Sequence, residues 1–187
     1  GRPRIITDIE SLSSATINLY LPGNYGGDAL SDILVGKVNP SGKLPYSYPS
    51  YVNSLVPYNY KPSDVQNNSQ GAYNYVGEVN YLYPFGYGLS YSSFEYSNLE
   101  VDKNIYKIND TIKINVSVKN NSSLLGKETI QLYSKDNYAT LTPDIKRIKS
   151  FKKIEIAPME TIKVYFNLPV SELSYINLKN QTEVEPG

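Results

Sequence analysis

The sequence predicts a mixed fold, in which a partial α/β piece is followed by an all-β sandwich. Two patterns predict it. Residues 15–35 read as an apolar strand, a glycine-rich loop and an amphipathic helix. Beyond residue 91, apolar side chains recur at every second position, which is the period of strands with one buried face. A length of 187 residues with 40% hydrophobic content allows one mid-sized domain or two small ones.

In the first part, residues 15–21 alternate like a buried strand that ends at Pro22-Gly23. Residues 8–14 are expected to form a short turn or helical connection. A helix is predicted over residues 28–35, with Asp28 capping its start and Gly36 ending it. One strand and one helix leave sheet edges and apolar faces uncovered, so we expect the missing strands to come from a longer protein.

Residues 39–90 are rich in proline, glycine, asparagine and tyrosine and show no sustained period, which indicates a long connecting segment. Alternation then begins at Phe94 and Tyr96 and returns in three later stretches. These stretches contain Ile112, Ile114, Val116 and Val118; Ile130 and Leu132; and Ile162, Val164, Phe166 and Leu168. A last element is expected over residues 175–184. Short antiparallel strands at this spacing are typical of a sandwich of immunoglobulin or fibronectin III type.

The composition excludes several kinds of chemistry. Histidine, cysteine and tryptophan are absent, so hydrolysis by a nucleophile with an imidazole base, a thiolate zinc site and disulfides are all excluded. No metal or cofactor is expected. Lysine plus arginine equals aspartate plus glutamate, at 18 each, so the charge favours neither nucleic acid nor an anionic membrane. No apolar run approaches the length of a membrane span.

Two longer motifs carry a family resemblance. Residues 21–45, which begin Leu21-Pro22-Gly23-Asn24-Tyr25-Gly26-Gly27-Asp28 and end Asn39-Pro40-Ser41-Gly42-Lys43-Leu44-Pro45, resemble the α/β sandwich domain of family 3 glycoside hydrolases. The run Leu82-Tyr83-Pro84-Phe85-Gly86-Tyr87-Gly88-Leu89-Ser90-Tyr91 is similar to the start of that family's fibronectin III-like domain. Gly1-Arg2-Pro3 and Glu185-Pro186-Gly187 also fit the family, so the resemblance covers the whole chain.

This resemblance implies a parent enzyme that removes β-linked glucose or xylose by the retaining route, with one carboxylate as nucleophile and another as acid/base. In the family, the nucleophile lies in an amino-terminal barrel and the acid/base glutamate lies ahead of the Gly-Arg-Pro strand, so both precede Gly1. No catalytic residue therefore carries over to this chain. The partners implied are the barrel, the remaining sandwich strands and the glycoside substrate, and the implied location is secreted or periplasmic.

Asn24 and Tyr25 are the candidate substrate-binding residues, because ligands of open α/β sheets lie beyond the carboxyl ends of strands. They would border the parent's cleft, although a tight turn from strand to helix explains the same loop. Asp28 and Asp32 share a helix face and could be read as a carboxylate pair, but capping and solvation account for both more simply. The glycine loop lacks the lysine of a phosphate-binding loop.

The tyrosines of the connecting segment have two readings. An exposed row could stack on sugar rings, but packing between domains is the simpler explanation. The row comprises Tyr58, Tyr60, Tyr73, Tyr75, Tyr81, Tyr83 and Tyr87. In the motif of residues 83–89, Phe85 and Leu89 offer apolar surface that a lone loop cannot bury. We therefore expect this motif to act as a clamp that joins the two domains in the parent enzyme.

Together these observations predict three parts: residues 1–57 as the end of an α/β sandwich domain, 58–90 as the connecting segment, and 91–187 as a fibronectin III-like sandwich that lacks its last strand. The predicted function is the C-terminal part of a β-glycosidase, structural and inactive alone. The alternative is a free-standing carbohydrate-binding or adhesion module. A module would fold unaided, whereas residues 1–57 of an enzyme part would need upstream strands.

Overall fold

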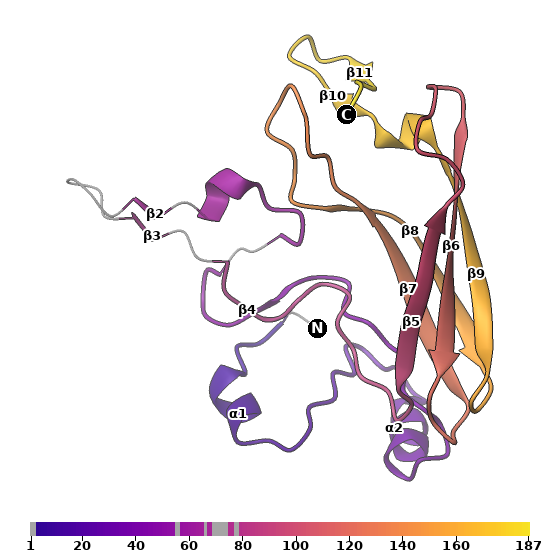
Figure 1. Ribbon diagram of the computed structural model, residues 1–187. Helices are drawn as coiled ribbons and strands as arrows, with labels where there is room; N and C mark the ends of the chain where they lie inside the picture. The colour runs from indigo at the N-terminus through magenta and orange to yellow at the C-terminus, as the bar shows by residue number, and fades with distance from the viewer. Residues whose placement is uncertain (1–2, 55–56, 66, 69–74, 77–78) are drawn as a thin grey trace. The chain divides into compact units, whose positions relative to one another are not determined.

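The computed structural model describes residues 3–54, 57–65, 67–68, 75–76 and 79–187, with side chains omitted for residues 67, 68, 75 and 76. The chain forms two compact units (Figure 1). The first unit contains residues 1–58 and 63–89, and the second contains residues 59–62 and 90–187. None of the described helices is long and apolar enough to cross a membrane.

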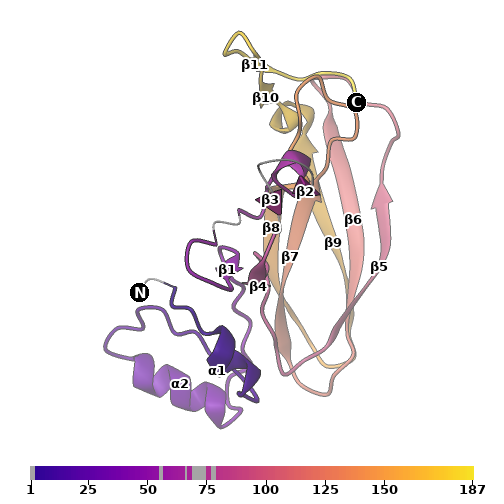
Figure 2. The ribbon, with the colours of Figure 1, turned by 90° about the vertical axis from the view of Figure 1, so that its left-hand side faces the viewer.

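The second unit is the predicted β-sandwich, and the prediction is confirmed. Five strands run alongside one another in Figures 1 and 2. They are β5 (Phe94–Val101), β6 (Thr111–Asn120), β7 (Gly126–Ser134), β8 (Arg147–Ile156) and β9 (Thr161–Pro169). One sheet has the order β5-β6-β9, the other pairs β7 with β8, and every pairing is antiparallel.

The core of the sandwich follows from the period of two. Burial alternates along β6 and β9, so each strand turns one row of apolar side chains inward. The core residues are Ile114, Val116, Val118, Ile130, Ile156, Val164 and Phe166. Two hydrogen bonds join the sheets as well: Tyr96 Oη donates to Glu128 Oε1 over 2.9 Å, and Asn120 Nδ2 donates to the Ile156 carbonyl over 3.1 Å.

Strand β8 was not predicted, and the last element is not a single strand. β10 (Tyr175–Ile176) and β11 (Thr182–Glu183) form a small antiparallel hairpin after the 3-10 helix η2 (Val170–Leu173). In Figure 1 the hairpin lies at the same end of the sandwich as the β7–β8 loop. The absence of a last strand stays a prediction, as does the division into residues 1–57, 58–90 and 91–187.

The first unit contains α1 (Thr7–Ser11), α2 (Gly26–Leu34), β1 (Tyr48–Pro49), β2 (Asn67–Asn68), β3 (Tyr75–Val76) and β4 (Tyr81–Tyr83), with 3-10 helix η1 (Pro62–Val65) at its margin. The short helix expected over residues 8–14 is present as α1. The helix predicted over 28–35 begins two residues earlier, and Gly36 ends it at φ +75°. Asp28 makes no capping hydrogen bond, because Tyr25 is the N-cap and Asp28 lies in the first turn.

The buried strand predicted over residues 15–21 is wrong for this structure. No strand is assigned there, and Ile17, Leu19 and Leu21 are 45%, 37% and 84% exposed. A strand exists only with a neighbour that accepts its backbone hydrogen bonds, and no described residue pairs with this segment. On α2, Leu34 is also 64% exposed while Leu30 and Ile33 are half-buried, so the apolar face predicted for the helix is only partly covered.

Residues 59–62 are a short strap on the second unit. The Ile145 amide donates to the Tyr60 carbonyl over 2.9 Å, and Lys61 Nζ donates to the Thr142 carbonyl over 2.7 Å. Asn59 Nδ2 donates to Asp144 Oδ2 over 3.2 Å. The β7–β8 loop thus holds part of the predicted connecting segment.

Candidate functional site

The candidate cleft-border residues Asn24 and Tyr25 lie in the tight loop that leads into α2. Gly23 adopts φ +68°, and a Cβ on Gly26 would meet the Pro22 ring at 2.4 Å, so the loop requires glycine at both positions. The Ala29 amide donates to the Tyr25 carbonyl over 3.1 Å. Tyr25 is 81% exposed and Asn24 is exposed, so both side chains are placed to meet a ligand.

The Asp28 and Asp32 pair has a structural explanation in part. Asp32 forms an ion pair with Lys37, with Nζ 3.0 Å from Oδ1, at the C-terminal end of α2. Asp28 is exposed in the first turn, where its charge opposes the helix dipole. Both roles are structural, but Asp28 makes no capping hydrogen bond, so the capping expected from the sequence is replaced by its interaction with the helix dipole.

The tyrosines of the first unit pack on one another. Tyr46 lies between Tyr20 and Tyr48, with ring centroids 6.4 Å and 5.9 Å away, and Tyr48 meets Tyr83 at 6.4 Å. Tyr83 then stacks on Tyr87 at 4.8 Å. This tyrosine ladder, Tyr20-Tyr46-Tyr48-Tyr83-Tyr87, joins segments that are far apart in the sequence. Tyr73 and the side chain of Tyr75 lie outside the described residues.

Hydrogen bonds fix the hydroxyl groups at the centre of the tyrosine ladder. The Tyr48 hydroxyl donates to the Arg4 carbonyl over 2.8 Å, and the Tyr83 hydroxyl donates to Glu10 Oε1 over 2.7 Å. The Glu10 hydrogen bond, helped by burial, raises the pKa of Tyr83 to about 12. These tyrosines therefore hold the N-terminal segment against β1 and β4 and are not free to stack on a sugar.

Phe85 stacks on Tyr58 within the first unit, with ring centroids 4.3 Å apart. Gly88 beside it packs so closely on residues 42–43 that a Cβ would meet the Gly42 carbonyl oxygen at 2.0 Å. Leu89 is 73% exposed. The predicted clamp motif thus docks on its own unit through Phe85, and its role in joining domains stays a prediction.

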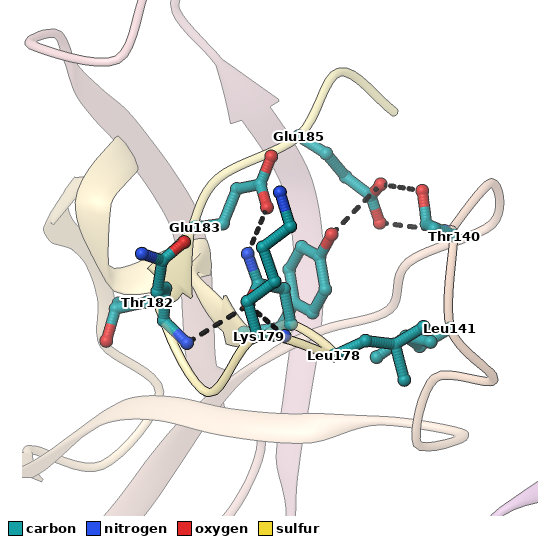
Figure 3. A pocket seen from close by; sticks show the side chains of 10 residues that line it. Thr140, Leu141, Leu178, Lys179, Thr182, Glu183 and Glu185 are labelled. Carbon is teal, nitrogen blue, oxygen red and sulfur yellow. Dashed lines mark hydrogen bonds between the residues drawn. The ribbon is translucent and has the colours of Figure 1, made fainter.

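A hollow of about 460 Å³, which the sequence did not predict, lies in the second unit. Its walls come from the β7–β8 loop and from the β10–β11 hairpin (Figure 3). The lining residues are Thr140, Leu141, Tyr175, Asn177, Leu178, Lys179, Gln181, Thr182, Glu183 and Glu185. The hairpin that forms one wall of this hollow could have been predicted from Asn177 and Asn180, because asparagine favours turns.

Glu185 is the most firmly held carboxylate of this hollow. It accepts hydrogen bonds from the Thr140 amide over 2.9 Å, from the Thr140 hydroxyl and from the Tyr175 hydroxyl over 3.4 Å. The Thr140 hydroxyl is the main cause that lowers the pKa of Glu185. Burial, followed by the nearby Glu183 and Glu185 charges, raises the pKa of Tyr175. Near neutral pH the hollow thus presents a carboxylate and a neutral phenol.

Two family descriptions match the chain. Residues 1–91 match the glycosyl hydrolase family 3 C-terminal domain, and residues 128–187 match a fibronectin type III-like domain. A β-xylosidase of Formosa agariphila is 35% identical over all of this chain and 26% of its own length. The lysosomal β-glucosidase of Dictyostelium discoideum and the periplasmic β-glucosidase of Salmonella typhimurium are 33% and 32% identical, again over 100% of this chain.

Solved structures of β-glucosidases are also similar to this chain. The β-glucosidase of Listeria innocua in complex with glucose matches with a TM-score of 0.89 at 32% identity and covers 100% of this chain, which corresponds to 27% of that enzyme. The chain thus spans about a quarter of the length of its relatives. On these matches the chain belongs to glycosyl hydrolase family 3, with that family's C-terminal domain followed by a fibronectin type III-like domain.

Proposed function

We propose that this chain is the C-terminal part of a retaining β-glycosidase that hydrolyses β-glucosides or β-xylosides, and that it is structural and inactive alone. The observation that carries the proposal is full coverage of this chain by β-xylosidase and β-glucosidase relatives of which it spans about a quarter. Three quarters of such an enzyme remain to supply the barrel, the other sandwich strands and the catalytic carboxylates.

The pKa values of the described carboxyl groups support the proposal that this chain is inactive alone. A retaining glycosidase needs two carboxyl groups about 5–5.5 Å apart, one of them with a raised pKa so that it can donate a proton. In the described part of the chain, the carboxyl groups with a displaced pKa are Glu100, Asp102 and Glu185, and hydrogen bonds lower all three. Lowered values suit charged structural groups and not a general acid.

Asn24 and Tyr25 are proposed to border the cleft of the complete enzyme. Their exposure and their position in the loop before α2 support this role, because no described residue of the first unit covers them. A secreted or periplasmic location is also proposed. The periplasmic relative of Salmonella typhimurium and the lysosomal relative of Dictyostelium discoideum support it, since both act outside the cytosol.

The alternative of a free-standing module requires the first unit to fold unaided. The exposed apolar side chains of residues 15–21 and of α2 argue against it, because a self-sufficient domain buries such surface. The enzyme part therefore accounts better for the whole chain.

Activity assays on nitrophenyl β-glucoside and nitrophenyl β-xyloside test the proposal. The 187-residue chain should release nitrophenol no faster than buffer, whereas the longer protein that contains it should turn over at least one of the two substrates. Asp28→Asn provides a control within this chain. Turnover by the chain alone that Asp28→Asn abolishes would overturn the proposal and place a catalytic site on α2.

A further inference from the structure

The hollow between the β7–β8 loop and the β10–β11 hairpin lies at one end of the sandwich, where loops meet. Sandwich domains commonly bind ligands at such ends, because rigid strands hold loops whose sequences are free to vary. The volume of about 460 Å³ lies within the range of about 300–1,000 Å³ that small-molecule sites occupy. Both walls belong to the second unit, so the hollow does not depend on any other part of the chain.

The polar side chains of the hollow are held in place before any ligand arrives. Thr140 fixes the Glu185 carboxylate through its amide and hydroxyl, as Figure 3 shows. Asn177 Nδ2 donates to Glu183 Oε2 over 2.8 Å. The other end of the same amide, Asn177 Oδ1, accepts from the amides of Lys179 and Gln181 over 2.9 Å and 3.0 Å. A single asparagine thus orders both the hairpin turn and the carboxylate beside it.

Unused hydrogen-bonding capacity remains around this frame. Among the described residues, the Lys179 ammonium and the Gln181 side-chain amide make no hydrogen bond or ion pair with the protein. An ammonium has three donors, and a carboxylate such as Glu183 has about four acceptor positions. Donors and acceptors therefore lie close together, and a ligand that offers both kinds of group can use them.

The charges and apolar surface narrow the class of ligand. Two carboxylates against one ammonium leave the hollow slightly negative, which disfavours phosphates, uronates and other anions. A multivalent metal ion is also disfavoured, because the described residues contain no group of three or more acidic side chains that could hold one. Tyr175, Leu141 and Leu178 add aromatic and aliphatic surface to the polar side chains. Neutral sugars combine hydroxyl groups with apolar ring faces and match this lining.

We propose that this hollow binds a neutral β-linked oligosaccharide as an accessory sugar site on the fibronectin type III-like domain. Glu183, Glu185 and Lys179 would bond the sugar hydroxyls, and Tyr175 would supply the contact to a ring face. The choice of β-linked glucose or xylose chains as ligands rests on the proposed function, whereas the hollow and its frame do not.

Nuclear magnetic resonance titrations of the isotope-labelled full chain test this site. The probes are cellotetraose and xylotetraose, with α-linked maltotetraose and anionic trigalacturonate for comparison. At least one β-linked probe should shift the amide signals of Thr140, Asn177 and Glu183 saturably. Glu183→Gln and Lys179→Ala should each raise the dissociation constant about tenfold, since each removes a charge-assisted hydrogen bond. The matched control is Glu155→Gln, an exposed glutamate on β8, which should leave binding unchanged.

The outcomes separate this inference from the proposed function. Absence of saturable shifts, shifts confined to the loop of Asn24 and Tyr25, or equal binding by Glu183→Gln and Glu155→Gln would each overturn the accessory site. Tighter binding of trigalacturonate than of the neutral probes would also overturn it. Hydrolysis of nitrophenyl glycosides by the longer protein is an independent readout: if hydrolysis persists while oligosaccharide binding is absent, only the accessory site fails.

Discussion

Replacement of Asn120, a small polar residue, should lower the free energy of unfolding of the sandwich strongly. It is fully buried at the end of β6, and its side chain makes three hydrogen bonds. Nδ2 donates to the carbonyls of Leu124 and Ile156 over 2.8 Å and 3.1 Å, and Oδ1 accepts from the Ser122 amide over 3.0 Å. Because Ile156 ends β8 in the opposite sheet, this side chain joins the two layers.

Asn120→Ala should lower the free energy of unfolding of the sandwich by about 3 kcal/mol. The buried Ile156 carbonyl loses a donor, which costs about 1–3 kcal/mol. The partly exposed Leu124 and Ser122 groups can turn to water and cost about 0.5–1.5 kcal/mol each. Urea unfolding followed by circular dichroism measures the change. With an m value of about 2 kcal/mol/M, the midpoint should fall by about 1.5 M.

Its neighbour Asn121 is the matched control. Asn121 is exposed, and among the described residues its side chain bonds only Glu95 Oε2, over 2.8 Å. Asn121→Ala keeps the backbone hydrogen bond to the Ser93 carbonyl and should change stability by less than about 0.5 kcal/mol. Asn120→Asp keeps the volume but exchanges the donor for an acceptor, so it should destabilise at least as much as the alanine variant. A loss below about 1 kcal/mol for Asn120→Ala, or wild-type stability of Asn120→Asp, would refute the reasoning.

Three further outcomes follow from the structure. Amide hydrogen exchange on the full chain should be slow in β6 and β9 and fast in residues 15–35; equal protection would mean that the first unit is self-sufficient. Thr140→Ala should raise the pKa of Glu185 toward its ordinary value, read from the carboxyl carbon signal; since the folded pKa is lowered, the stabilisation is present above the ordinary value and is lost as pH falls through the folded one. Phe85→Ala should cost about 1–2 kcal/mol of local stability around β4, because the half-buried ring loses its stack on Tyr58; an unchanged exchange rate there would contradict this.

The sequence predicted those strands whose inner faces are mostly apolar. β6 and β9 place aliphatic or aromatic residues at their inward positions, apart from Asn120 at the end of β6, so their period was visible. β8 was missed because Lys152 occupies an inward position opposite Ile130, which interrupts the alternation. Lys152 stays exposed, and its ammonium lies over the Phe166 ring at 5.5 Å from the centroid. A one-dimensional pattern cannot show such a contact.

The site was harder to predict than the fold. Asn24 and Tyr25 could be proposed from the sequence because glycines mark their loop locally, and their role stays a prediction. The hollow of the second unit combines Thr140 with Glu183 and Glu185, and their meeting depends on how the β7–β8 loop folds against the hairpin. Long-range pairing of this kind leaves no periodic signal in the sequence. The strand expected at residues 15–21 failed for the same reason, because its existence depends on partners that its own residues do not specify.

The strap lies within residues 58–90, the segment predicted as the connection, and it packs on the second unit. Residues 59–62 belong with the sandwich, although residues before and after them belong with the first unit. Asp144 links the strap to the sandwich, because its Oδ2 atom accepts from Asn59 Nδ2 over 3.2 Å and from Arg147 Nε over 3.0 Å. A sandwich begun at residue 91 would lose the Asn59 hydrogen bond to Asp144. The Ile145 amide would also lose its acceptor, the Tyr60 carbonyl, and the Thr142 carbonyl would lose its donor, Lys61 Nζ. The strap therefore supports the β7–β8 loop, and that loop also forms one wall of the hollow.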